Sequence, residues 1–140
     1  MRSVYEYRRR PGAAWGMVVR LAAEHSVTRE PPAGAVRTGQ PNVWLSVPDN
    51  LAARDVRWLA HGLSLVADQL RPDARDEHAI VTVHALETPV LTDHQAEAAA
   101  AAMIEWLREN TGVPGIDHTV RFDAEENRYV FTWGEPGRPA

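Results

Sequence analysis

Six histidines are the residues in this 140-residue chain whose chemistry best suits proton transfer or metal binding. Four of them directly follow an acidic residue: His25, His78, His94 and His118. Neighbouring side chains on a strand point to opposite faces, so we do not expect these pairs to act as acid–base dyads. The sequence has no HExxH motif and no two histidines at the i,i+4 spacing of helical metal sites. It therefore predicts no metal and no cofactor.

His84 is the candidate catalytic residue. It falls in a predicted strand, on the face shared by Ile80, Thr82 and Leu86, which we expect to point inward. An inward histidine is either a hydrogen-bonded core residue or, where it lines a pocket, a general base. No acidic residue stands at a spacing that would orient the ring, so the sequence favours the structural role.

Other catalytic patterns are absent from the sequence. There is no cysteine, and no GxSxG, Walker A or GxGxxG motif. The balance favours a non-catalytic protein. The alternative is a small-molecule enzyme or binding protein with a pocket between helices and sheet, lined by His84 or His61.

The helix predicted near residues 50–70 carries two apolar stripes. Its main stripe has spacings of 4, 3, 4, 3 and 4 and comprises Ala52, Val56, Leu59, Leu63, Val66 and Leu70. A second stripe, Leu51, Trp58 and Leu65, recurs every seven residues and lies roughly 110–150° from the first. A sheet cannot cover both stripes. We therefore predict a self-association or partner interface of Leu51, Arg54, Trp58, His61, Gly62 and Leu65, because Trp and Arg are typical binding hot spots.

The sequence allows three alternatives to a partner protein as the cover of the second stripe. The N-terminal segment or the second predicted helix of the same chain could cover it, or a ligand could lie there. Solution mass distinguishes self-association from cover by the chain itself.

Arg8–Arg10 is the one basic run. The formal net charge of −4 and the pI of about 5.8 argue against nucleic-acid binding, since such proteins are usually basic. We expect a solvated arm. A nucleic-acid-binding module that uses Arg8–Arg10 is a second alternative to the protein-contact function.

Periodicity predicts the elements that position these residues. The expected helices lie near 50–70 and 93–111, and the expected strands near 43–47, 79–87, 119–123 and 128–133. Asp49 or Asn50 could cap the first helix, Thr92–Gln95 matches a capping box for the second, and Gly112 would end it. Val4–Arg8 fits an edge strand and Glu30–Pro41 a long loop. Trp15–His25 fits a strand or a helix, and we favour the strand.

This order of elements predicts an α+β fold, a two-layer sandwich with a mainly antiparallel sheet and two main helices packed on one face. The first strand–helix–strand unit fits a parallel crossover. We expect residues 1–133 to form a single domain and 134–140 a frayed C-terminal tail.

Composition bounds the class of protein. The chain is 44% hydrophobic and 24% charged, as is typical of globular domains. No run of 18 apolar residues could span a membrane. All fifteen basic residues are arginine, which with the many alanines indicates a bacterium with a high-GC genome. We therefore expect a small cytoplasmic protein that acts through protein–protein contact rather than through nucleic acid, as a homodimer or with a protein partner.

Overall fold

The structure is a computed structural model that describes residues 2–12, 15–89 and 92–134. Its elements are β1 (Ser3–Arg9), β2 (Met17–Thr28), β3 (Val36–Arg37), β4 (Val43–Ser46), α1 (Ala53–Val66), the 3₁₀ helix η1 (Ala67–Gln69), β5 (His78–Glu87), α2 (Ala98–Thr111), β6 (His118–Asp123) and β7 (Arg128–Trp133). Five strands form a sheet in the order β1-β2-β5-β4-β3. Only β4 and β5 in this sheet are parallel, as predicted for the strands on either side of α1.

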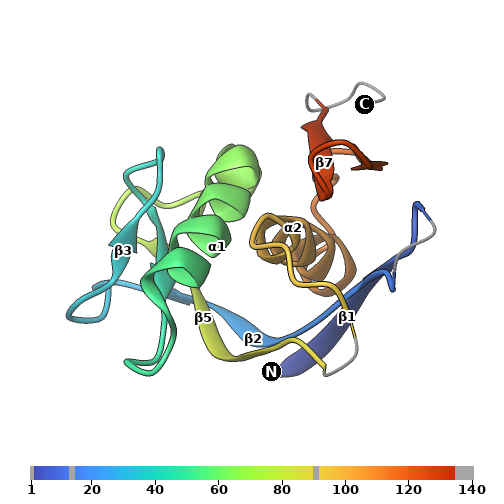
Figure 1. Cartoon of the computed structure of the whole chain (residues 1–140). Helices are drawn as coiled ribbons and strands as arrows, with labels where there is room; N and C mark the ends of the chain where they lie inside the picture. Colours follow the sequence, from blue (N-terminus) through green and yellow to red (C-terminus); the bar gives the residue numbers. More distant parts are fainter. Residues whose placement is uncertain (1, 13–14, 90–91, 135–140) are drawn as a thin grey trace.

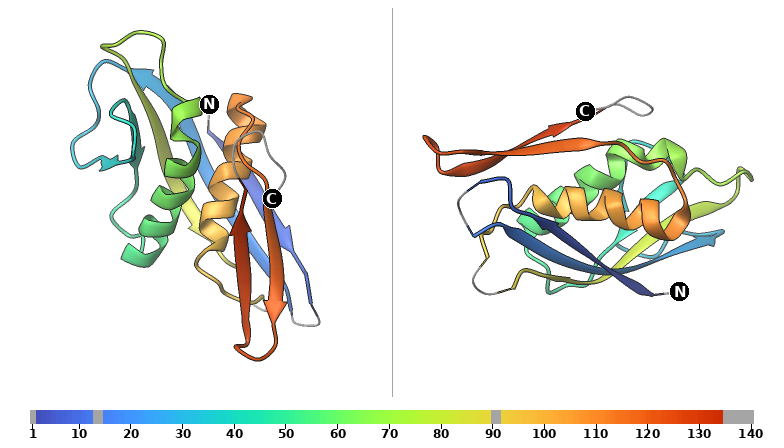
Figure 2. Two further views of the ribbon diagram at one scale, coloured as in Figure 1. Left: turned by 90° about the horizontal axis from the view of Figure 1, so that it is seen from above. Right: turned by 90° about the vertical axis from the view of Figure 1, so that its right-hand side faces the viewer.

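The predicted α+β class is confirmed, with a further layer. Both helices lie on one face of the five-stranded sheet (Figure 1). The β6–β7 hairpin is a separate two-stranded sheet. It packs over α2 on the side away from the main sheet (Figure 2). As a result α2 is enclosed, and every residue from Ala98 to Ile104 is buried.

The N-terminal quarter forms strands, as favoured from the sequence. β1 is an edge strand, and β2 pairs with β1 on one side and β5 on the other. The Leu21–Ala23 segment has helix-forming residues, but it lies between two strands and is buried, so tertiary pairing overrides local propensity. The predicted loop Glu30–Pro41 contains the short strand β3, which pairs with β4.

The predicted cap of the first helix is wrong. The helix begins at Ala53 with Ala52 in the N-cap position, and no side chain caps it. Asp49 and Asn50 instead form the middle of a turn before the helix, in which the Leu51 N–H bonds to the Pro48 carbonyl.

The predicted capping box of the second helix is also wrong. α2 begins at Ala98, not near residue 93. The Thr92 hydroxyl donates to the Pro89 carbonyl, while the Gln95 side chain accepts from the Tyr129 N–H and donates to Glu97. Thr92 thus bonds within its own segment, and Gln95 joins this segment to β7. The predicted end is confirmed, because Gly112 adopts a left-handed conformation with φ of 77°.

α1 and α2 touch where both have small residues. A Cβ atom on Gly62 would lie 2.5 Å from the Ala100 carbonyl oxygen. The alanine run of α2 suits a helix, because alanine is the strongest helix former. The structure shows that it also allows close helix packing.

No helix in the described part of the chain is long and apolar enough to cross a membrane. At the C-terminus, the Gly134 N–H donates to the Asp117 carbonyl at 2.7 Å, so the first residue of the predicted frayed tail is anchored. Residues 135–140 of that tail lie outside the described residues.

Candidate functional site

The six predicted interface residues lie on α1 or just before it, in three different settings. Gly62 is buried against α2, so its missing side chain serves packing within the chain. Leu51, Trp58 and Leu65 are half-buried and pack against the core. Arg54 and His61 are exposed. The second apolar stripe is thus partly covered by this chain and partly open.

Trp133 of β7 joins this surface, which we call the Trp58 cluster: Trp58, His61 and Trp133. The Trp58 and His61 rings meet edge-on with centroids 5.3 Å apart, and the His61 and Trp133 centroids are 6.1 Å apart. Trp133 is half-buried. Sequence periodicity could not find it, because only the tertiary fold brings β7 beside α1.

Beside the Trp58 cluster, the outward face of α1 carries a polar stripe of Arg57, His61, Ser64 and Asp68. All four residues are exposed, and Asp68 lies in η1 directly after the helix. The spacings of 4 and 3 place Arg57, His61 and Ser64 within roughly 60° of one another around the helix, and Asp68 follows them in η1. The stripe is basic at its N-terminal end and acidic at its C-terminal end. We call it the α1 stripe.

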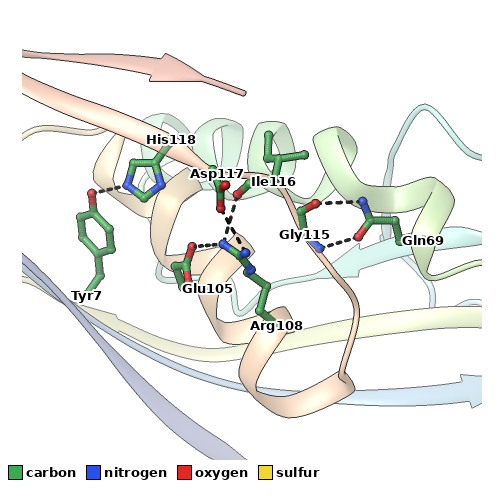
Figure 3. Close-up of polar contacts among 8 residues, drawn as sticks. All are labelled: Tyr7, Gln69, Glu105, Arg108, Gly115, Ile116, Asp117 and His118. Atoms are coloured by element: carbon green, nitrogen blue, oxygen red, sulfur yellow. Dashed lines mark hydrogen bonds and ion pairs between the residues drawn. The ribbon is translucent and has the colours of Figure 1, made fainter. Parts of the chain in front are cut away.

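The segment between α2 and β6 fixes the hairpin that carries Trp133 (Figure 3). The Gln69 side chain accepts from the Gly115 N–H at 2.7 Å and donates to the Gly115 carbonyl at 3.1 Å. Arg108 forms ion pairs with Glu105 and Asp117, each at 3.1 Å. These contacts join the segment to both helical elements and so hold the hairpin in place beside α1.

A hydrogen-bonded pair ties β6 to β1. Tyr7 is fully buried, and its hydroxyl lies 2.8 Å from His118 Nε2 (Figure 3). The His118 ring also stacks on Phe131. Burial, reinforced by the nearby Arg9 guanidinium, lowers the pKa of His118, and burial raises the pKa of Tyr7. Both groups are therefore neutral near pH 7, and the geometry fits a structural link.

A second link holds the start of β7. The Tyr129 hydroxyl donates to Asp93 Oδ2 at 2.5 Å, and the Gly16 N–H lies 3.2 Å from the same oxygen. Burial, followed by the hydrogen bond to Asp93, raises the pKa of Tyr129 to about 12. Asp93 therefore joins three separate segments, a role that the sequence did not reveal.

His84 does not face the core as predicted. In the β2–β5 ladder, Ala22 is opposite Ala85 and Ala23 is opposite Val83, so His84 is left without a partner. This extra residue is a β-bulge. The bulge is not what turns His84 away, because the core side of β5 before it is that of Ala79, Val81 and Val83. By simple alternation His84 lies with Thr82 on the opposite face. Val83, not His84, belongs to the hydrophobic core.

The structure also supplies the acidic partner that the sequence did not show. His84 Nε2 lies 2.6 Å from Glu24 Oε1 on β2, and the two side chains are 27% and 38% exposed. A carboxylate at this distance can orient an imidazole. By its exposure the pair is a surface hydrogen bond, and it becomes an acid–base pair only if a substrate covers it.

Among the described residues, no three histidine, aspartate or glutamate side chains gather closely enough to hold a metal ion. Comparisons with protein-family models, curated proteins and solved structures found no match to this chain. The function must therefore be argued from the surfaces themselves.

Proposed function

We propose that this protein acts through protein–protein contact and forms a homodimer through the outward face of α1. The observation that carries the proposal is the α1 stripe, whose charges are self-complementary, next to the half-open Trp58 cluster. Arg and Trp are the residue types that contribute most at protein interfaces.

A two-fold axis makes the stripe its own partner. In a two-fold interface the same patch is used by both copies, so residue i faces j and j faces i. The midpoint between Arg57 and Asp68 along the chain is also the midpoint between His61 and Ser64. Two antiparallel α1 helices crossing at that midpoint therefore place Arg57 of each copy opposite Asp68 of the other. The pairing is made twice, once on each side of the axis.

The Trp58 cluster supplies the apolar part of this contact. Trp58 and Leu65 flank the α1 stripe on the side toward α2, and both are only half-buried in the single chain. α1 has 14 residues, about 21 Å of helix. A contact of this length lies at the low end of interface sizes, so we expect a weak, concentration-dependent dimer.

Light scattering over a range of concentrations tests the proposal. The wild type should pass from monomer to dimer mass, and Trp58→Glu should remain monomeric with an unchanged circular dichroism spectrum. Trp15→Glu is the matched control, because Trp15 is 64% exposed and lies outside α1; it should dimerise normally. A wild type that stays monomeric at high concentration contradicts the proposal. If Trp58→Glu unfolds, Arg57→Glu, which changes an exposed position, should remain monomeric and takes its place in the test.

We further propose that the protein works in the cytoplasm of a bacterium with a high-GC genome. Supporting this are the use of arginine without lysine and the absence of cysteine, which fits a reducing compartment.

A small-molecule function based on His84 is the second candidate. Its support is the 2.6 Å contact with Glu24, which could keep one imidazole nitrogen available for proton transfer. It would be favoured if His84→Gln abolished a chemical activity without loss of stability.

A further inference from the structure

We propose that His118 is a pH-dependent anchor of the β6–β7 hairpin: its protonation releases the Trp133 end of the hairpin and so weakens the contact through the outward face of α1. The hairpin is a separate two-stranded sheet that packs over α2 and, among the described residues, pairs with no strand of the main sheet (Figure 2). One end of it can therefore move without breaking a strand pair. The effect on the contact rests on the proposed dimer, whereas the release itself occurs within a single chain.

Tyr7 supplies the bond that makes this anchor sensitive to protons. Its hydroxyl lies 2.8 Å from His118 Nε2, and the Tyr7 side chain is fully buried (Figure 3). Within the described part of the chain, this hydroxyl makes no other hydrogen bond. A neutral imidazole can accept the hydroxyl hydrogen at Nε2, but an imidazolium has only N–H donors. Protonation therefore leaves a buried O–H without an acceptor, which destabilises the docked hairpin.

The charges around the ring do not compensate for the burial of an imidazolium. The charged groups that face His118 are Arg9 of β1, Glu105 and Arg108 of α2, and Asp117 directly before β6. Arg108 pairs with both carboxylates at 3.1 Å, so their negative charge is already balanced in part. The rings of β7 that contact His118, those of Phe131 and Trp133, carry no charge. Burial, followed by the Arg9 guanidinium, therefore lowers the pKa of His118 in the docked hairpin.

Trp133 connects His118 to the proposed interface. Its ring centroid lies 5.7 Å from that of His118 and 6.1 Å from that of His61. His61 in turn meets Trp58 edge-on, with the centroids 5.3 Å apart. Release of this end of the hairpin thus removes Trp133 from the Trp58 cluster. The other end, at Tyr129, is held by a different hydrogen bond, so the change is a movement of one end and not unfolding.

Proton linkage sets the direction and the size of the effect. In the released hairpin His118 is solvated and its pKa returns to about 6.5, whereas in the docked hairpin the pKa is lower. The released state therefore binds more protons below about pH 6.5. The equilibrium constant for docking falls by up to about tenfold for each pH unit until the pKa of the docked state is reached. Near neutral pH the hairpin stays docked.

A monomeric variant tests the release without the dimer. In Arg57→Glu, nuclear Overhauser effects between the Trp133 and His61 rings should fall at least about threefold in intensity between about pH 7.5 and pH 5. His118→Gln in the same background keeps a hydrogen-bond acceptor at every pH, so the effects should persist on acidification. His25→Gln is the matched control, because His25 is also a partly buried histidine with a lowered pKa; it should behave as its parent protein.

Sedimentation equilibrium of the wild type over the same pH range tests the effect on the contact. The dissociation constant of the dimer should rise at least about threefold on acidification. His61→Gln, which removes the exposed imidazole of the α1 stripe, should retain this rise, and His118→Gln should abolish it.

The proposal is overturned if the Trp133–His61 effects of Arg57→Glu persist at about pH 5, or if folded His118→Gln loses them as its parent does. The first measurement needs no substitution at His118, so it decides the question even where His118→Gln does not fold. Loss of the effects with an unchanged dissociation constant overturns the link to the contact. A wild type that is monomeric at every pH, with the effects lost on acidification, refutes the proposed dimer and supports the release.

Discussion

Gly62→Ala tests the close crossing of α1 and α2, because the added methyl group has no space. The new Cβ would lie 2.5 Å from the oxygen, 2.8 Å from the Cα and 3.0 Å from the carbonyl carbon of Ala100. All three atoms belong to the backbone of α2, so no side-chain rotation can relieve the overlap. The helices must separate, and the contacts along their whole crossing loosen.

Two opposing terms set the size of the effect. Alanine favours a helix over glycine by about 1 kcal/mol, which stabilises the variant. Overpacking in a core costs about 1–3 kcal/mol, and a clash between two backbones belongs at the upper end. We therefore expect the free energy of unfolding to fall by about 2 kcal/mol. For a domain of this size that lowers the melting temperature by roughly 4–8 °C.

Urea unfolding followed by circular dichroism measures this change. Gly39→Ala is the matched control, since a Cβ on Gly39 would meet no atom within 4 Å and the residue does not have a positive φ. It should leave stability unchanged or raise it slightly. A Gly62→Ala protein as stable as the wild type would refute the helix crossing described above.

Stability should also fall as the pH drops below about 6.5, because burial lowers the pKa of both His25 and His118 in the folded chain. The unfolded chain then binds more protons than the folded one, so acid favours unfolding. Urea titrations between about pH 7.5 and pH 5 measure how steeply the free energy of unfolding falls with pH. His118→Gln should reduce that slope. A flat profile would mean that these imidazoles are not buried. For His84→Gln we expect a loss below about 1 kcal/mol, because its pair with Glu24 is partly exposed. A loss above about 2 kcal/mol in thermal unfolding would instead place His84 in the core.

Local patterns predicted the elements well where hydrophobic periodicity was strong. The 4, 3, 4, 3, 4 stripe of the first helix corresponds to α1 and η1, and Leu59, Leu63 and Val66 from it are fully buried. β5 lies between β2 and β4, a position that suits its apolar run because the strand is paired on both sides. In these segments one face packs against the core, so the spacing of apolar residues predicts the secondary structure directly.

The errors have separate physical causes. Thr92 and Gln95 have the spacing of a capping box, but their side chains bond elsewhere. The core side of β5 is that of Ala79, Val81 and Val83, and His84 lies on the opposite face. Both faces of the strand begin apolar, so alternation alone did not decide which face meets the helices. Neither the bulge nor the approach of Glu24 can be derived from the local sequence.

The candidate surface was predicted in part. The second stripe indicated α1 and Trp58, and the structure leaves Trp58 half-open. The sequence did not reveal that Gly62 faces α2 or that Trp133 joins the Trp58 cluster. Both facts depend on how α2 and the hairpin pack around α1.

A charge-exchange series in sedimentation equilibrium tests the proposed homodimer most directly. Arg57→Glu and Asp68→Arg should each weaken dimerisation about tenfold, because every substitution places two like-charge pairs across the two-fold axis. The double variant, Arg57→Glu with Asp68→Arg, restores opposite charges between copies and should recover most of the wild-type dissociation constant. A double variant no tighter than either single variant, or a wild type that remains monomeric throughout, would contradict the account.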